Sequence, residues 1–349
     1  MRIAQVAPLF ESVPPRYYGG TERVVSYLTE ELVKQGHEVT LFASGDSQTS
    51  AELIPIVDKA LRLNKLHTDP LAHHIILLNQ LNMMSQEFDM IHFHIDLLHF
   101  AQHQFMLTPS LTTMHGRLDL PHLSTVFAEF KDIPLISISN SQRIPLPKAN
   151  WHATVYNGIP QENYTYRAQA GEYLAFLGRI SPEKGIERAI EIALRVGMKL
   201  NIAAKVDKVD EDYYCDVIKP LLKNPLIEYI GEIDEQEKDE FLGNAYATLF
   251  PIDWPEPFGL VMIESMACGT PVVAFNRGSV SEVMLQGETG FIVNNVNDAI
   301  EAVEKIETIS RQCCRYVFEK RFSATQMANG YLKAYESLRE QEFKTPLAV

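Results

Sequence analysis

The sequence has few cysteines, no long apolar run and no excess of positive charge. Only four of its 349 residues are cysteine, and Cys313 and Cys314 are adjacent, which suits neither a disulfide framework nor a zinc site. No window approaches 18 consecutive apolar residues, so we expect no transmembrane segment. The chain opens on an apolar run at residues 3–7 without the pattern of a signal peptide, and we therefore expect a cytoplasmic protein.

The charge balance limits the class of partner. The chain carries 31 Lys and Arg residues against 45 Asp and Glu residues, a formal net charge of −14. Nucleic acid is therefore not expected as a partner, because a polymer of phosphates requires clustered cations. A local cationic pocket for a single phosphate group remains compatible with this balance, and so does peripheral contact with a membrane surface.

Apolar runs alternate with helical periodicity along both halves of the chain. Strands are expected at residues 2–7, 37–43, 90–93, 111–114, 135–139, 153–156, 173–177, 200–204, 227–230, 247–250, 271–275 and 291–293. Helices are expected at residues 21–35, 185–196, 235–245, 260–267, 281–285, 297–309, 311–320 and 324–340. The alternation predicts two α/β domains, each a doubly wound Rossmann-like parallel sheet.

The length suits two such domains facing a central cleft. We expect the first domain at residues 1–160 and the second at residues 172–322. Residues 161–171 are polar and aperiodic, which indicates a linker, and residues 323–349 would form a terminal helix. In doubly wound sheets, ligands bind outside the carboxyl ends of the strands, so the candidate sites are the loops that follow strands.

The most informative loop spans residues 253–260 and precedes a helix that carries Glu264. Two prolines and a glycine interrupt the loop, so it is neither helix nor strand. Gly259 lets a ligand approach the backbone closely, and the following helix directs its N-terminal N–H groups to the same place. Glu256 and Glu264 would then reach different parts of one ligand. Their eight-residue spacing recurs elsewhere in the chain, and solvated surface charges are the alternative.

A second loop, at residues 178–185, brings two cations to a helix start. Arg179 leaves the end of a strand and Lys184 directly precedes the helix. Two cations beside helix N–H groups form a site where a diphosphate could bind. An ordinary loop with two solvated cations is the alternative.

Two loops in the first half also follow strands. Gly19 and Gly20 permit a tight turn, but no third glycine completes a dinucleotide-binding fingerprint. His115, followed by Gly116, could donate a hydrogen bond to a substrate hydroxyl. A plain glycine turn and a helix-capping histidine are the alternatives.

All eleven histidines lie at or before His152. His92 and His94 would point to one side of a strand, and His99 and His103 to one face of a helix. No carboxylate motif surrounds these four residues, so we favour structural roles and expect no metal site.

In their order along the chain, these motifs resemble those of glycosyltransferase family 4, the retaining nucleotide-sugar glycosyltransferases with a GT-B fold. The resemblance covers nearly the whole chain. It rests on the two-glycine turn, the His-Gly pair, an Asn-Gly junction, the Gly-Arg-x4-Lys-Gly loop and a Glu-x7-Glu block followed by Gly-Thr-Pro. The chain departs from the family at Ile159 and Pro160, where an aspartate is common.

The resemblance implies roles for the charged residues. Arg179 and Lys184 would neutralise the donor diphosphate, Glu264 would hold the ribose hydroxyls, and Glu256 would hold hydroxyls of the transferred sugar. In the first domain, His115 would contact the donor sugar.

The resemblance also implies backbone contacts to the donor. N–H groups near Phe258, Gly259 and Leu260 would bind the sugar-phosphate, and the base would lie near Ala204 and Gly231. From the first domain, which would lie on the acceptor side, Gly19 and Gly20 would close on the phosphate. The terminal helix would cross back to that domain.

The implied activity is hexosyl transfer with retention of configuration, by front-face attack of an acceptor hydroxyl and without a cofactor. The donor would be a UDP-sugar or a GDP-sugar, and the acceptor a carbohydrate, a lipid-linked molecule or a small molecule of polysaccharide or glycoconjugate biosynthesis. A GT-B sugar-nucleotide epimerase and a non-catalytic sugar-nucleotide-binding protein are the alternatives.

Residues 58–78 mix basic and apolar side chains, and a solvated helix is favoured there over a lipid contact.

Overall fold

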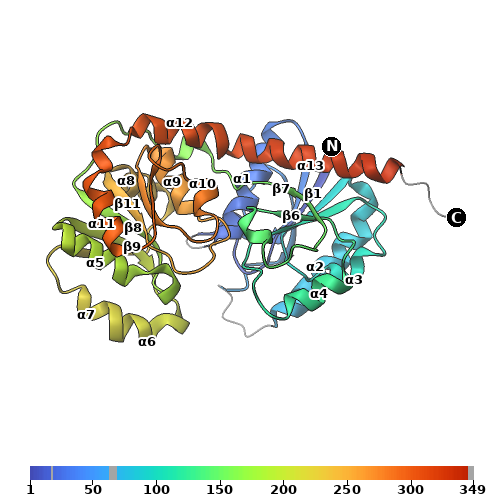
Figure 1. Cartoon of the computed structure of the whole chain (residues 1–349). Helices are drawn as coiled ribbons and strands as arrows, with labels where there is room; N and C mark the ends of the chain where they lie inside the picture. Colours follow the sequence, from blue (N-terminus) through green and yellow to red (C-terminus); the bar gives the residue numbers. More distant parts are fainter. Residues whose placement is uncertain (17–18, 63–68, 345–349) are drawn as a thin grey trace. The chain divides into compact units, whose positions relative to one another are not determined.

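The computed structural model describes residues 1–16, 19–62 and 69–344. It contains two compact units, the first formed by Met1–Gly158 with Ala324–Val349 and the second by Ile159–Ser323 (Figure 1). Each unit is built on one parallel sheet with helices between its strands, which confirms the predicted α/β class and doubly wound topology. No helix in the described parts of the chain is both long and apolar enough to span a membrane.

The sheet of the first unit has the strand order β3-β2-β1-β4-β5-β6-β7. Its strands are β1 (Arg2–Val6), β2 (Glu38–Ser44), β3 (Glu52–Val57), β4 (Met90–Phe93), β5 (Ser110–Met114), β6 (Leu135–Ser137) and β7 (Trp151–Thr154). The order of strands changes direction between β1 and β4, so the ends of these strands form the topological switch point of the unit.

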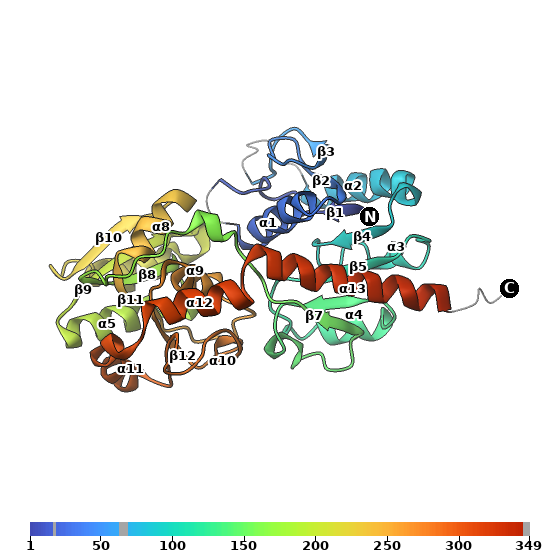
Figure 2. The same ribbon diagram turned by 90° about the horizontal axis from the view of Figure 1, so that it is seen from above.

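The main helices of the first unit are α1 (Gly20–Lys34), α2 (Pro70–Met84), α3 (Phe100–His103), α4 (Leu123–Glu129) and α13 (Ala324–Lys344). The last of these, α13, packs against α1 and β7, as Figure 2 shows. Sequence patterns missed β3 and α4, and the helix expected within residues 58–78 is α2, which begins at Pro70 and extends to Met84. Proline interrupts β3, an edge strand, and α2 is apolar on most sides, so neither has a clear period. Part of segment 58–78, residues 63–68, lies outside the described residues.

The sheet of the second unit has the order β10-β9-β8-β11-β12-β13, with its switch point between β8 and β11. Its strands are β8 (Tyr173–Arg179), β9 (Lys199–Lys205), β10 (Ile227–Gly231), β11 (Ala245–Phe250), β12 (Val272–Phe275) and β13 (Gly290–Val293). Its helices include α5 (Ile186–Val196), α6 (Glu211–Tyr213), α7 (Lys219–Leu221), α8 (Glu235–Gly243), α9 (Leu260–Cys268), α10 (Val280–Val283), α11 (Val296–Glu304) and α12 (Arg311–Arg321). The residues of β12 are all buried, as expected for a strand covered by helices on both faces.

The expected linker at residues 161–171 is instead packed onto the second unit. Tyr164 is buried and donates a hydrogen bond to Glu264 at 3.2 Å. The backbone N–H of Thr165 donates to Asp239, which also forms an ion pair with Arg167 at 2.9 Å. These specific contacts explain why the segment has no hydrophobic period although it is ordered.

A buried arginine joins three segments at the amino ends of the strands in the second unit. Arg311 on α12 is 8% exposed and donates hydrogen bonds to the carbonyl oxygens of Arg167, Gly243 and Ala245, and to Oγ1 of Thr270. Each of these four contacts is 3.0 Å or shorter. The rigid fork of a guanidinium can satisfy this many acceptors at once, whereas a lysine ammonium cannot.

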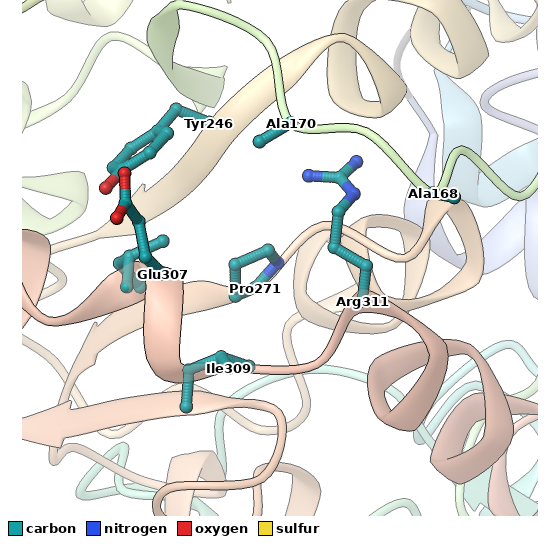
Figure 3. A pocket seen from close by; sticks show the side chains of 8 residues that line it. Ala168, Ala170, Tyr246, Pro271, Glu307, Ile309 and Arg311 are labelled. Carbon is teal, nitrogen blue, oxygen red and sulfur yellow. The ribbon is translucent and has the colours of Figure 1, made fainter.

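A pocket of about 250 Å³ lies beside Arg311 (Figure 3). Its walls include Tyr246, Pro271, Ile306 and Glu307. The pocket lies where β11 and β12 begin, whereas ligands of doubly wound sheets bind where strands end. Because the Arg311 donors already bind backbone carbonyls, we assign this end of the sheet to stability.

Replacing Arg311 with lysine should lower the free energy of unfolding by about 2–4 kcal/mol, because buried carbonyl groups would lose their donors. The matched control is Arg195→Lys, since Arg195 is half exposed and pairs with Glu191 one turn away. The control should change stability by less than about 0.5 kcal/mol. Thermal or urea unfolding of both variants measures the difference, and equal stabilities would contradict the structural role of Arg311.

Candidate functional site

Two loops of the second unit meet at the carboxyl ends of β8 and β11, which are neighbours at the switch point. One follows β8 and the other follows β11. A backbone hydrogen bond from Asp253 N–H to the Glu183 carbonyl, 2.9 Å long, joins them. Gly185 has a φ of 69°, and a Cβ there would lie 2.2 Å from the carbonyl oxygen of Pro251, so only glycine fits.

The junction of the two loops brings Lys184 to Glu256. Lys184 Nζ lies 2.5 Å from Glu256 Oε2, and the two side chains are only 16% and 11% exposed. Trp254 completes the group, because its Nε1–H donates to the same carboxylate oxygen at 3.0 Å and its ring lies 4.9 Å from Lys184 Nζ. The structure therefore brings together two residues that the sequence placed in separate motifs.

The loop after β11 leads directly into α9. Gly259 precedes this helix with a φ of 80°, and no side chain caps the helix there. The N–H groups of Phe258, Gly259 and Leu260 thus lie at the N-terminal end of a nine-residue helix, next to the loop that carries Glu256. A helix N-terminus favours an anion, which agrees with the expectation from the sequence.

A turn after β12 supports this loop, and sequence reasoning missed it. The Ser279 N–H donates to the Glu256 carbonyl at 3.0 Å, and Ser279 Oγ donates to the Phe258 carbonyl at 2.9 Å. Gly278 has a φ of 55°, and a Cβ there would lie 2.3 Å from the Glu256 carbonyl oxygen. The Asn-Arg-Gly-Ser sequence after an apolar strand was the available signal, but the partner of this turn could not be read from it.

The second carboxylate of the motif, Glu264, lies in the middle of α9. It is 2% exposed, and Tyr164 donates a hydrogen bond to its Oε1. A buried carboxylate requires such a partner, because the desolvation of an unpaired charge is costly. The alternative of a solvated helix charge is therefore wrong for Glu264.

Arg179, at the end of β8, is surrounded by carboxylates. It pairs with Glu183 at 2.5 Å, Asp207 at 3.5 Å and Asp210 at 3.6 Å. Burial raises the pKa of Asp210, although Arg179 acts in the opposite direction. Carboxylates of the protein therefore neutralise both Arg179 and Lys184. An incoming anion has to displace these carboxylates to reach the two cations.

Ala204 and Gly231 lie on adjacent strands, near the ends of β9 and β10. Gly231 pairs in register with the residue before Ala204 and has a φ of 88°. The carbonyl oxygen of Ala204 accepts a hydrogen bond from Tyr229 at 2.9 Å. This part of the sheet offers backbone groups and aromatic rings.

In the first unit, Gly20 begins α1 and Gly19 is buried before it. A Cβ at Gly19 would lie 2.8 Å from Pro15, whereas a Cβ at Gly20 would meet open space. Glu22 lies in the first turn of α1 and is 7% exposed, and burial raises its pKa. Tyr17 and Tyr18 of the same loop lie outside the described residues.

His115 follows β5, and its Nε2 lies 2.8 Å from Nδ1 of His94. Burial lowers the pKa of His115 to about 4, so the ring is neutral at physiological pH. The sequence alternative of a helix-capping histidine is not what the structure shows, because the ring of His115 contacts another histidine.

The four clustered histidines all have partners within the first unit. His92 and His94 lie side by side with ring centroids 3.9 Å apart and bind hydroxyl and amide groups. His99 stacks on Phe93 at 3.7 Å, and His103 bonds to a serine. Within residues 1–16, 19–62 and 69–344, no group of three His, Cys, Asp or Glu side chains could hold a metal ion.

Comparison with known sequences identifies both units. Residues 18–151 match the family model described as Glycosyltransferase Family 4, and residues 167–316 match the model described as Glycosyl transferases group 1. The chain is 25% identical to the glycogen synthase of Mycobacterium tuberculosis, over 96% of each chain.

Solved structures show the same fold. Sucrose-phosphate synthase from Thermosynechococcus elongatus superimposes with a TM-score of 0.80 at 18% identity, covering 97% of this chain and 99% of that one. Anabaena Alr3699/HepE in complex with UDP and glucose gives 0.76 at 16% identity, over 97% of this chain and all of the other. At these identities the likeness establishes the GT-B fold.

The support of the Glu256 loop by Gly278 can be tested with alanine. Gly278→Ala should lower the free energy of unfolding by about 2–4 kcal/mol, because the new Cβ overlaps the Glu256 backbone and a positive φ is strained. Gly287→Ala is the control, since Gly287 has a φ of 76° but no atom within 4 Å of its Cβ position. In the control, the free energy of unfolding should fall by only about 1 kcal/mol, which is the cost of a positive φ for a residue with a Cβ.

Tryptophan fluorescence shows whether the loss of stability in Gly278→Ala comes from the Glu256 loop. Trp151 and Trp254 are the two tryptophans of the chain, so with Trp151 replaced by phenylalanine the fluorescence reports on the Glu256 loop. The emission should change in the Gly278→Ala variant and not in the Gly287→Ala variant. Identical spectra in both variants would show that Gly278 does not position the loop.

Proposed function

The chain belongs to glycosyltransferase family 4, and we propose that it transfers a sugar, with retention at the anomeric carbon, from a nucleoside diphosphate-sugar to an acceptor hydroxyl. Membership makes the chain a glycosyltransferase enzyme with a GT-B fold. The observation that carries the proposed donor chemistry is the contact of Lys184 with Glu256 at the switch point of the second unit.

The donor diphosphate is proposed to bind Arg179, Lys184 and the N-terminus of α9. Both cations follow β8, and the N–H groups of Phe258, Gly259 and Leu260 follow β11. As the bond between sugar and diphosphate breaks, negative charge develops on the leaving phosphate oxygen. Fixed cations and N–H donors stabilise that charge without a metal or other cofactor. The complex of Anabaena HepE with UDP and glucose supports a donor of this class.

The proposed binding step exchanges one internal contact for two contacts with the donor. In the free protein, Lys184 and Glu256 satisfy each other. With the donor bound, Lys184 turns to the phosphate and Glu256 accepts hydrogen bonds from hydroxyls of the transferred sugar. Glu264 holds the ribose hydroxyls, and the base lies near Ala204 and Gly231. Because the internal partner is released only when both ligand groups are present, the exchange favours an intact nucleotide-sugar.

The first unit is proposed to add contacts through its own strand ends, with Gly19 and Gly20 at the phosphate and His115 at the donor sugar. The acceptor hydroxyl attacks the face of the anomeric carbon from which the diphosphate leaves. The bond from that carbon to the diphosphate breaks, a bond to the acceptor oxygen forms, and the departing phosphate takes the acceptor proton. This front-face route retains configuration without a covalent enzyme intermediate.

The reaction is proposed to occur in the cytoplasm. All four cysteines are free, as expected in a reducing compartment. The acceptor class remains a carbohydrate, a lipid-linked molecule or a small molecule, with peripheral membrane contact as one mode of access.

A thermal-shift panel of UDP-sugars and GDP-sugars identifies the donor, because a ligand that binds the folded state raises the unfolding temperature. With that donor, Lys184→Ala and Glu256→Gln should each lower kcat by about 10²–10³-fold. Both variants should also unfold at a lower temperature, because each leaves a partly buried charge without its partner, so kcat is measured well below that temperature. Lys199→Ala is the matched control, since Lys199 pairs with Glu228 at 2.5 Å but is half exposed on the same unit. The control should keep nearly full activity.

Near-normal turnover in both site variants would contradict the proposal. Conversion of the donor to a different sugar nucleotide, with no acceptor present, would identify an epimerase instead. Donor binding with no transfer to any acceptor would identify a non-catalytic binding protein.

A further inference from the structure

Seven side chains of the first unit form a continuous run of hydrogen bonds that we name the polar chain. Its members lie on or directly after the three strands β1, β4 and β5 and on α13, and six of them are at most 1% exposed. They are Gln5, His92, His94, Thr113, His115, Tyr331 and Tyr335. His115, at one end, is half-buried, so the polar chain leads from α13 to the residue proposed to contact the donor sugar.

The first half of the polar chain runs from His115 to Tyr335. Nε2 of His115 lies 2.8 Å from Nδ1 of His94, and Nε2 of His94 lies 2.7 Å from Oε1 of Gln5. The Gln5 amide nitrogen then donates to the hydroxyl of Tyr335 at 3.2 Å. A single glutamine side chain thus separates the histidines from the tyrosine.

The second half runs from Tyr335 back to Tyr331. The Tyr335 hydroxyl lies 2.7 Å from Nδ1 of His92, whose Nε2 lies 2.7 Å from Oγ1 of Thr113. Thr113 donates to the hydroxyl of Tyr331 at 3.0 Å. The two tyrosines occupy successive turns of α13 and are both fully buried.

The rings of the polar chain are neutral at physiological pH. Burial lowers the pKa of His92 and His94 well below the usual range and that of His115 to about 4. Burial also raises the pKa of both tyrosines. Each neutral imidazole has one N–H donor and one acceptor nitrogen, so fixing one bond of the run fixes the next.

The amide of Gln5 determines which atom donates and which accepts in each hydrogen bond of the polar chain. Its Oε1 can only accept, so Nε2 of His94 carries the hydrogen and Nδ1 of His94 accepts. The hydrogen between the two rings therefore belongs to Nε2 of His115, which leaves Nδ1 of His115 as a bare acceptor. The Tyr335 hydroxyl fits this orientation, because it accepts from the Gln5 nitrogen and its own hydrogen is then available to Nδ1 of His92, 2.7 Å away.

We propose that the polar chain fixes His115 as the Nε2–H tautomer, so that its Nδ1 accepts a hydrogen bond from a hydroxyl of the donor sugar. Gln5, His94 and Tyr335 are positioning residues that act through His115. This assignment reverses the sequence expectation that His115 donates. It rests on the proposed function only for the ligand that supplies the hydroxyl, because the tautomer is a property of the free protein.

The tautomer can be measured by long-range ¹⁵N–¹H correlation NMR on the full chain labelled with ¹⁵N-histidine. Signals of His115 are assigned by their loss in the His115→Asn variant. At pH 7, Nε2 should show the shift of a protonated nitrogen and Nδ1 that of a non-protonated one. A protonated Nδ1 would overturn the proposal, since it would require the Gln5 amide and every bond after it to be reversed.

Two tyrosine variants test whether Tyr335 sets the tautomer of His115, or whether loss of any buried hydroxyl on α13 has the same effect. Tyr335→Phe removes the partner that distinguishes the two ends of the Gln5 amide, so His115 should populate both tautomers. Tyr331→Phe removes an equally buried hydroxyl of the same helix but leaves Gln5 and His94 in place, so the tautomer should not change. Both variants should lose similar stability. Equal tautomer populations in the two variants would overturn the role of Tyr335.

Kinetics supply a second readout once the donor is known. Tyr335→Phe should lower kcat/KM for the donor about five- to tenfold, as expected for loss of one oriented hydrogen bond, and Tyr331→Phe less than about twofold. Equal kinetic losses would also count against the proposal. If the NMR result holds but no nucleotide-sugar binds, the proposed function fails while the assignment of His115 stands.

Discussion

The contact between Lys184 and Glu256 is the interaction on which the candidate site depends. Removing either partner would leave a partly buried charge without compensation, which is costly. The contact forms only because β8 and β11 are neighbours at the switch point and their loops are joined by the bond from Asp253 to Glu183. The same contact keeps the free site neutral, so the donor has to supply both a phosphate for the lysine and hydroxyls for the carboxylate.

The surrounding structure explains how this pair is held in place. The turn of Gly278 and Ser279 supports the Glu256 loop from behind, and Gly185 allows the Lys184 loop to approach Pro251. Arg311 secures the opposite end of the same sheet with four donors. The first unit shows a similar arrangement. There the polar chain, which begins on α13, orients His115 at the end of β5. In both units, buried polar contacts fix the side chains that reach the strand ends.

Much of the fold and of the site could be predicted from local patterns. The strand at Met90–Phe93 and the start of α9 at Leu260 follow from apolar runs bounded by prolines, glycines and polar residues. The edge strand β3, with Pro55 within it, lacked such a signal. The family resemblance correctly implied that the terminal helix returns to the first unit. The individual side-chain contacts between distant segments could not be predicted. The carboxylates around Arg179, the turn at Gly278 and the tyrosines of α13, some 330 residues from Gln5, depend on tertiary packing alone.

The most direct test of the account is the affinity for a nucleoside diphosphate without its sugar, measured by calorimetry with UDP and GDP. Such a ligand offers Lys184 a phosphate but offers Glu256 no sugar. If the internal pair competes with the donor, Glu256→Gln should bind the diphosphate more tightly than the natural chain, and Lys184→Met more weakly. Weaker binding in both variants, or no change in either, would contradict the exchange of contacts on which the proposed function rests.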